Sequence, residues 1–220
     1  MASIGVASGH EVREYSVGEE IGNSVTHGVG ALLAVAAIVL CCVKAARDGG
    51  GILTLAAVAY SIPLFLEYLM STLYHALAVP GAKRVFKVLD HCCIYLLIAG
   101  SYTPFCLVTL ANSGGGALAA VVWGIAAAGI VAETFWVFRP RWVSTVIYLA
   151  MGWSVMLELP ALLALLDPAG LALLVAGGLC YSVGCVFYVL KKVPYLHMVF
   201  HLFVLAGSVC QFLAIVLYVL

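Results

Sequence analysis

The stretch LHMVFHLFVLAGSVCQFLAIVLYV, residues 196–219, decides the fold class of this chain. It contains no Asp, Glu, Lys or Arg and exceeds the roughly 20 apolar residues that cross a bilayer as a helix. Further apolar segments, some with isolated charges, occupy residues 22–43, 52–79, 86–110, 117–138, 142–166 and 169–190. We therefore predict an all-α integral membrane protein, with a short polar tail at 1–20 and a single seven-transmembrane helix bundle at 21–220.

The composition supports a membrane protein and excludes other classes. Of 220 residues, 65% are hydrophobic and 9% are charged, and the mean hydropathy is +1.16. Soluble domains carry about 25% charged residues, and disordered chains combine low hydrophobicity with high net charge. The formal net charge of zero provides no basic field for nucleic acid. The expected surroundings and partners are therefore membrane lipids, with no nucleic acid.

The basic residues predict an orientation in the cell membrane. Seven spans place eight Lys and Arg residues on the side of the N-terminus and two on the other side. The eight are Arg13, Lys83, Arg84, Lys87, Arg139, Arg141, Lys191 and Lys192, and the two are Lys44 and Arg47. Because basic loops stay in the cytoplasm, we expect a cytoplasmic N-terminus and a C-terminus outside.

Polar side chains gather at the expected cytoplasmic ends of five segments. Ionisable groups within a membrane indicate a functional site, so their convergence predicts a polar cavity in the inner-leaflet half of the bundle. They are Glu20, Asn23, His27, Glu67, Ser71, His75, Asp90, His91, Glu133, His197 and His201.

The spacing of two histidines suggests a metal site within this cavity. His197 and His201 are four residues apart, so they share one helix face and can give two ligands to one metal. A third histidine would complete a His₃ set with an open position, which is typical of catalytic zinc. His75 and Asp90, expected at the same depth, strengthen this hypothesis. Hydrogen bonds between helices or a proton path remain alternative interpretations.

Other polar residues favour structural roles. Four residues spaced along one helix are interpreted as contacts between helices or loop anchors rather than catalytic groups: Glu20, Asn23, Thr26 and His27. His91 lies about 100° around the helix from Asp90, so both are not expected to face one metal. Glu67 and Glu133 are expected to be paired or protonated. The eight cysteines lie within apolar runs and are interpreted as buried free thiols.

Four linked motifs resemble the hemolysin III family, which belongs to the superfamily of progestin and adiponectin receptors. The resemblance extends from about Glu19 to Gly207, and the compact chain is similar to the bacterial branch. The motifs are EIGNSVTHGVG at 20–30, STLYH at 71–75, DH at 90–91 leading into GSYTP at 100–104, and HMVFH at 197–201.

The resemblance implies a zinc ion bound by His75, His197 and His201 near the cytoplasmic face. It also implies that Asp90 lies near the water at the metal and that Ser71 lies near the metal. Related receptors hydrolyse ceramide, so the leading hypothesis is a zinc-dependent hydrolase of ceramide-like lipid amides, with Asp90 and Ser71 in catalysis. The family name refers to haemolytic activity. The alternatives are therefore a pore-forming, cytolytic membrane protein with structural zinc and a lipid-sensing receptor.

Overall fold

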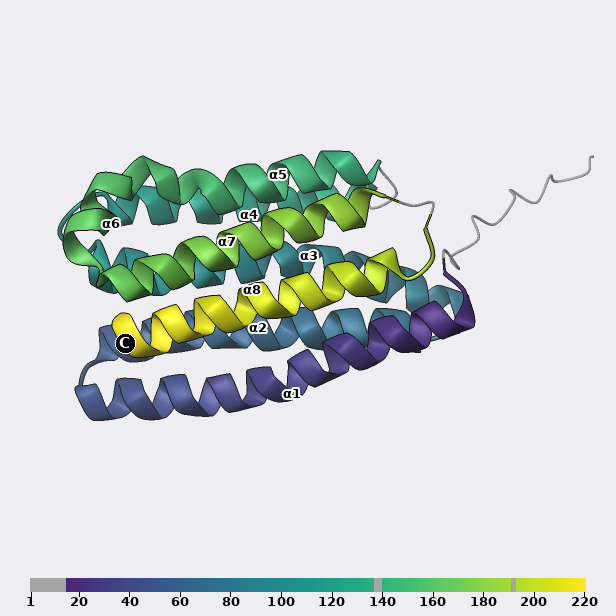
Figure 1. Cartoon of the computed structure of the whole chain (residues 1–220), viewed down its shortest axis with the longest axis horizontal. Coiled ribbons are helices and arrows are strands. Elements are labelled where there is room, and N and C mark those ends of the chain that lie inside the picture. Colours follow the sequence, from purple (N-terminus) through teal and green to yellow (C-terminus); the bar gives the residue numbers. More distant parts are fainter. Residues whose placement is uncertain (1–14, 137–139, 191–192) are drawn as a thin grey trace, which may run out of the picture.

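The computed structural model describes residues 15–136, 140–190 and 193–220, and this part of the chain is helical without strands. Seven helical spans in it are long and apolar enough to cross a membrane, which confirms the predicted multi-pass membrane protein. They lie side by side along one direction (Figure 1). The α-helices are α1 (Val17–Asp48), α2 (Gly51–Ala76), α3 (Pro80–Pro104), α4 (Gly115–Trp136), α5 (Arg141–Trp153), α6 (Leu159–Leu165), α7 (Pro168–Val189) and α8 (Leu196–Tyr218).

Two helices begin earlier than the apolar pattern predicts. Helix α1 begins at Val17 rather than at residue 21, because the Ser16 side chain accepts a hydrogen bond from the Glu19 N–H and the Glu19 carboxylate accepts one from the Ser16 N–H. This capping box satisfies exposed donors at the helix start. Helix α3 begins at Pro80 rather than at residue 86, so Asp90 lies about 15 Å along the helix instead of in its first turns. Residues 1–14 of the expected tail lie outside the described residues.

The third and fifth spans change their helical geometry within the apolar part of the bundle. Helix α3 continues into the π-helix η1 (Phe105–Thr109), and α5 continues through the 3₁₀-helix η2 (Ser154–Glu158) into α6. The Tyr102 hydroxyl donates to the Met151 carbonyl at 3.0 Å and accepts from the Val155 N–H at 2.9 Å. The hydroxyl therefore satisfies backbone groups where the fifth span leaves α-helical geometry.

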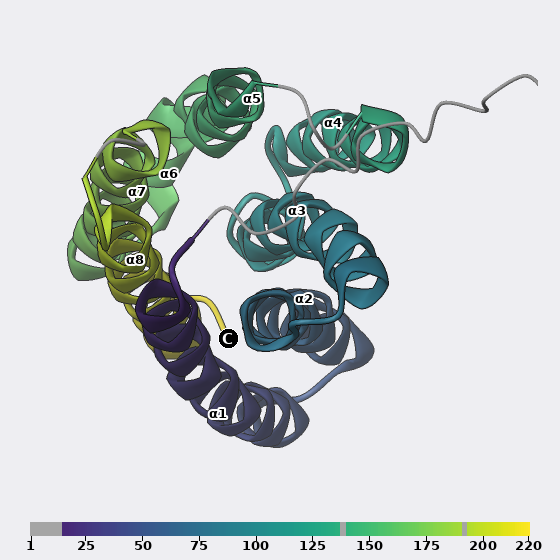
Figure 2. The same cartoon turned by 90° about the vertical axis from the view of Figure 1, so that its right-hand side faces the viewer.

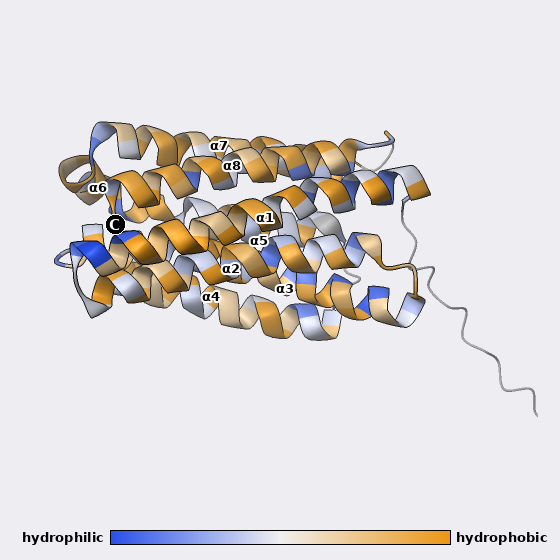
Figure 3. Cartoon of the chain, turned by 90° about the horizontal axis from the view of Figure 1, so that it is seen from below, coloured by the Kyte–Doolittle hydropathy of each residue, from blue (hydrophilic) through white to orange (hydrophobic). Residues whose placement is uncertain are grey.

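Close packing between glycines and tyrosines holds the helices together. A Cβ atom added to Gly30 would lie 2.3 Å from the Tyr68 ring, and one added to Gly129 would lie 2.2 Å from Tyr95. Small residues let helices approach closely where burial of apolar surface supplies no driving force between them. Viewed along the bundle, α1, α8 and α7 form one side, while α2 and α3 lie on the other (Figure 2). Hydrophobic residues cover much of the helices along their length (Figure 3).

Candidate metal centre

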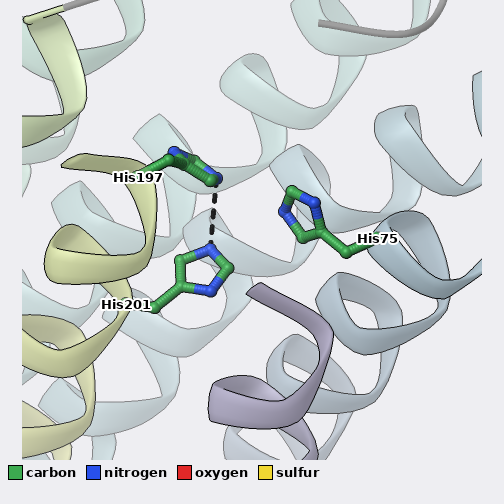
Figure 4. Close-up of side chains that lie close together, drawn as sticks. All are labelled: His75, His197 and His201. Atoms are coloured by element: carbon green, nitrogen blue, oxygen red, sulfur yellow. Dashed lines mark hydrogen bonds between the residues drawn. The ribbon is translucent and has the colours of Figure 1, made fainter. Parts of the chain in front are cut away.

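Three histidines from two helices meet at the end of the bundle where α1, α3 and α8 begin. His75 lies in the last turn of α2, and His197 and His201 lie in the first two turns of α8. One nitrogen from each ring lies within 4.8 Å of the others, and the Nε2 atoms of His197 and His201 are 3.1 Å apart (Figure 4). The structure therefore brings together the three predicted ligands.

A carboxylate and a lysine orient His75. The Nδ1–H of His75 donates to Glu20 Oε2 at 2.6 Å, and Lys83 Nζ forms an ion pair with Glu20 Oε1 at 2.7 Å. Lys83 also donates to the Tyr74 carbonyl at 2.9 Å. Because Nδ1 carries the proton in this neutral tautomer, Nε2 carries the lone pair that a metal requires. Such carboxylate–histidine pairs are typical of the outer contacts of zinc ligands.

The backbone of α1 orients His201. Its Nδ1 lies 3.2 Å from the Asn23 carbonyl oxygen and 3.2 Å from Thr26 Oγ1. The His27 ring stacks on the His201 ring, with centroids 3.5 Å apart and planes inclined by 18°. When Nδ1–H donates to the carbonyl, the Nε2 lone pair faces His197. The residues predicted to join helices therefore also position a candidate ligand.

The donor set fits zinc. Zinc–imidazole distances of about 2.0–2.1 Å in a tetrahedron place ligand nitrogens about 3.3 Å apart. The observed 3.1 Å between His197 and His201 already matches this spacing. The 4.8 Å limit for the full triad requires side-chain movements on the order of one ångström. Three neutral imidazoles leave a fourth tetrahedral position for water or substrate.

The two predicted catalytic residues form a pair beside the triad. Ser71 lies one helical turn before His75 on α2, and its hydroxyl lies within hydrogen-bonding reach of the Asp90 carboxylate on α3. Both side chains are buried, and Lys87 lies close enough to Asp90 to interact electrostatically. Ser71 thus lies one helical turn from a candidate ligand, and Asp90 is its partner on α3.

The remaining predicted polar residues lie outside the triad. His91 Nδ1–H donates to the Lys87 carbonyl at 2.8 Å, and its Nε2 lies 3.3 Å from the Tyr188 hydroxyl. Glu133 is paired, because it accepts a hydrogen bond from the Tyr148 hydroxyl at 3.3 Å. Glu67 is buried, and its Oε2 makes no hydrogen bond within the described residues.

An apolar cavity lies inside the bundle between α3, α5, α7 and α8. Its volume is about 140 Å³, and its walls include Leu97, Phe105, Leu162 and Val204. Tyr188 and Phe200 also line it, and their rings lie 5.8 and 5.4 Å from the His197 ring. These two aromatic residues therefore lie beside both the cavity and one candidate ligand.

Sequence reasoning missed the contacts that orient the ligands. The sequence pattern favours a contact between helices or a loop anchor for Glu20 and indicates only a loop charge for Lys83. Both side chains are buried, and together they hold His75 in place. The signal available in the sequence was an acid at the start of an apolar helix, but its partners lie 55 and 63 residues away along the chain.

The bundle and its polar end define a seven-helix membrane protein with a candidate three-histidine metal centre. The chain belongs to the Haemolysin-III related family, whose model matches residues 15–212. It is 42% identical to Hemolysin-3 of Bacillus cereus over 93% of both chains. It is 40% identical to the Hemolysin-3 homolog of Bacillus subtilis over 93% of this chain and 96% of the relative. It is 28% identical to the human Monocyte to macrophage differentiation factor, over 71% of this chain and 67% of that protein.

Replacing Glu20 with Gln should weaken metal binding. The amide keeps the size of the side chain but removes the charge that pairs with Lys83 and accepts the His75 proton. Loss of such an outer contact costs about 10–100-fold in metal affinity, and competition with a chelator of known affinity measures the change. An affinity equal to that of the unaltered protein would show that Glu20 serves packing alone.

Proposed function

We propose that this protein is a zinc-dependent hydrolase of lipid amides of the ceramide type. The observation that carries this proposal is the position of the histidine triad beside the apolar cavity, with Tyr188 and Phe200 lining the cavity and lying next to His197. A polar site that can hold a metal at the end of an apolar cavity suits a substrate with a polar head and a long hydrocarbon chain.

The residues of the site have different roles in amide hydrolysis. Zinc held by His75, His197 and His201 would supply Lewis acidity and would lower the pKa of a bound water to about 7. Asp90 accepts the proton of the attacking water and returns a proton to the amine nitrogen as the C–N bond breaks. Ser71 donates a hydrogen bond to the carbonyl oxygen as negative charge develops on it. The products are a fatty acid and a free amine.

The cavity is long enough for an acyl chain. Along α8 it is lined from Phe200 to Gln211, a separation of about 16 Å at the rise of an α-helix. Gly152, on α5, lines the same cavity, and a Cβ atom added there meets no other atom within 4 Å. The position therefore has room for a larger side chain without a change in the helix.

Gly152→Leu should obstruct the cavity and leave the metal site unchanged. We expect turnover of long-chain substrates to fall by about tenfold or more, because a leucine side chain fills space that the acyl chain needs. Gly124→Leu is the matched control, since Gly124 lies on α4, is exposed and also has no atom within 4 Å of an added Cβ. Equal turnover by the two variants across a series of chain lengths would contradict acyl binding here.

The direct test is hydrolysis by the purified, zinc-loaded protein. A panel of ceramide-like amides, assayed by mass spectrometry of the released fatty acid, should be hydrolysed by the unaltered protein and not by His197→Ala. Absent or metal-independent turnover across the panel would refute the proposal. Ion leakage from liposomes in the absence of hydrolysis would instead support the pore-forming alternative.

We also propose that the metal centre faces the cytoplasm. The division of basic residues supports this orientation, although Arg13, Arg139, Lys191 and Lys192 lie outside the described residues. In a bacterial host, alkaline phosphatase fused after Leu220 should be active, and green fluorescent protein at the same position should not fluoresce. The reverse pattern would place the metal centre outside.

A further inference from the structure

The short segment formed by Tyr15 and Ser16 precedes α1, and the Tyr15 ring lies over one side of the histidine triad. His75 and His201 are buried, whereas His197 is partly exposed, so the triad meets its surroundings at His197. The Tyr15 ring stacks on the His197 ring, with centroids 4.8 Å apart and planes inclined by 22°. The same ring lies 5.7 Å from the ring of His75. One aromatic side chain thus contacts candidate ligands from both α2 and α8.

Contacts on the C-terminal side of Tyr15 hold this segment in place. Glu19 Oε1 accepts a hydrogen bond from the Tyr195 N–H at 2.9 Å, immediately before α8. A Cβ atom added to Gly18 would lie 2.8 Å from the Tyr195 hydroxyl oxygen. Tyr195 itself adopts a left-handed backbone conformation with φ of 63°, which is uncommon for a residue other than glycine. The segment is therefore anchored to the start of α8, next to the residue that Tyr15 covers.

A second anchor connects the segment to α2 and α3. Glu20 accepts the proton of His75 Nδ1 and forms an ion pair with Lys83. Tyr15 consequently lies only a few residues from two independent attachments, one to α8 and one to the α2–α3 end. An aromatic ring held in this way is positioned to exclude water from the histidines. The apolar cavity lies on a different side of the triad, where Tyr188 and Phe200 are next to His197.

We propose that Tyr15 covers the metal centre and limits the exchange of the metal ion, chelators and other water-soluble species with the triad. In this arrangement lipid reaches the site through the cavity, and aqueous solutes pass Tyr15. The inference rests on the metal centre of the proposed function and does not depend on which reaction the centre performs. It assigns to Tyr15, just before α1, a role in access rather than in ligation.

The test is the rate at which zinc leaves the loaded, detergent-solubilised protein when a strong chelator is added in excess. Tyr15→Ala should release zinc at least about tenfold faster, and Tyr15→Phe, which keeps the ring, should stay within about twofold of the unaltered protein. Phe135→Ala is the matched control, because Phe135 is an 85% exposed aromatic residue near the end of α4, at the same end of the bundle. Equal rates of zinc release from Tyr15→Ala and Phe135→Ala would refute the proposal that Tyr15 covers the metal centre.

Two further measurements test whether Tyr15 covers the site if Tyr15→Ala does not fold or if the protein binds no zinc. If Tyr15→Ala does not fold, Glu19→Ala replaces it, because this variant keeps the ring and removes the oxygen that accepts the Tyr195 N–H. Faster release from Glu19→Ala supports the proposal, and unchanged release contradicts it. If the protein binds no zinc, acylation of His197 by diethyl pyrocarbonate, followed by mass spectrometry, reports access directly. Faster acylation in Tyr15→Ala supports the cover, and an equal rate contradicts it.

Discussion

Alanine in place of His75, His197 or His201 is expected to remove zinc from the purified protein. We expect about one zinc per chain in the unaltered protein and less than about a tenth of that in each variant, because two imidazoles no longer complete the ligand set of the site. The effect should exceed the loss caused by Glu20→Gln, since that change alters only the orientation of one ligand. Metal analysis by mass spectrometry after size-exclusion chromatography measures the occupancy.

His91→Ala is the matched control for these variants. It removes the same type of side chain near the same end of the bundle, but His91 is bound to the Lys87 carbonyl and the Tyr188 hydroxyl and lies outside the triad. We expect it to retain zinc at the level of the unaltered protein. Retention of metal in all three triad variants would contradict the site and remove the basis of the proposed hydrolysis.

Asp90→Asn is expected to abolish most of the turnover while leaving zinc bound. The amide preserves the volume of the side chain, but it cannot accept the proton of the attacking water. General acid–base catalysis contributes about 10²–10⁴-fold, so we expect a loss of at least about a hundredfold in kcat. Steady-state hydrolysis of a ceramide-like amide, together with metal analysis of the same sample, tests both parts of this prediction.

Glu133→Gln provides the control for Asp90→Asn. Glu133 is also a buried carboxyl group, and it accepts hydrogen bonds from the Tyr148 and Ser144 hydroxyls rather than from Ser71. The amide oxygen of glutamine can still accept these bonds, so we expect less than about a threefold change in turnover. Equal losses in both variants would indicate general damage to the bundle, and full activity of Asp90→Asn would exclude its role as the base.

The sequence predicts the seven spans because the bilayer imposes a simple requirement on every helix. Each span must be apolar over about 20 residues, and this property can be read locally in stretches such as 196–219. Charges and helix caps determine where each helix ends, and the helix ends were less predictable than the spans. Helix α3 starts at Pro80 within a polar stretch because Lys83 is buried against Glu20 and the Tyr74 carbonyl, two contacts that no local pattern indicates.

By itself, the sequence determined that this is a multi-pass helical membrane protein and that His197 and His201 share one helix face. Both properties depend on residues close together in the chain. The family resemblance already named His75 as the third ligand, and the tertiary structure brings its ring to the other two. Only the tertiary structure decided that Glu20 and the Asn23 carbonyl orient the rings and that Tyr15 stacks over the site. These contacts depend on how the helices pack, and packing is set by the whole bundle rather than by any one segment.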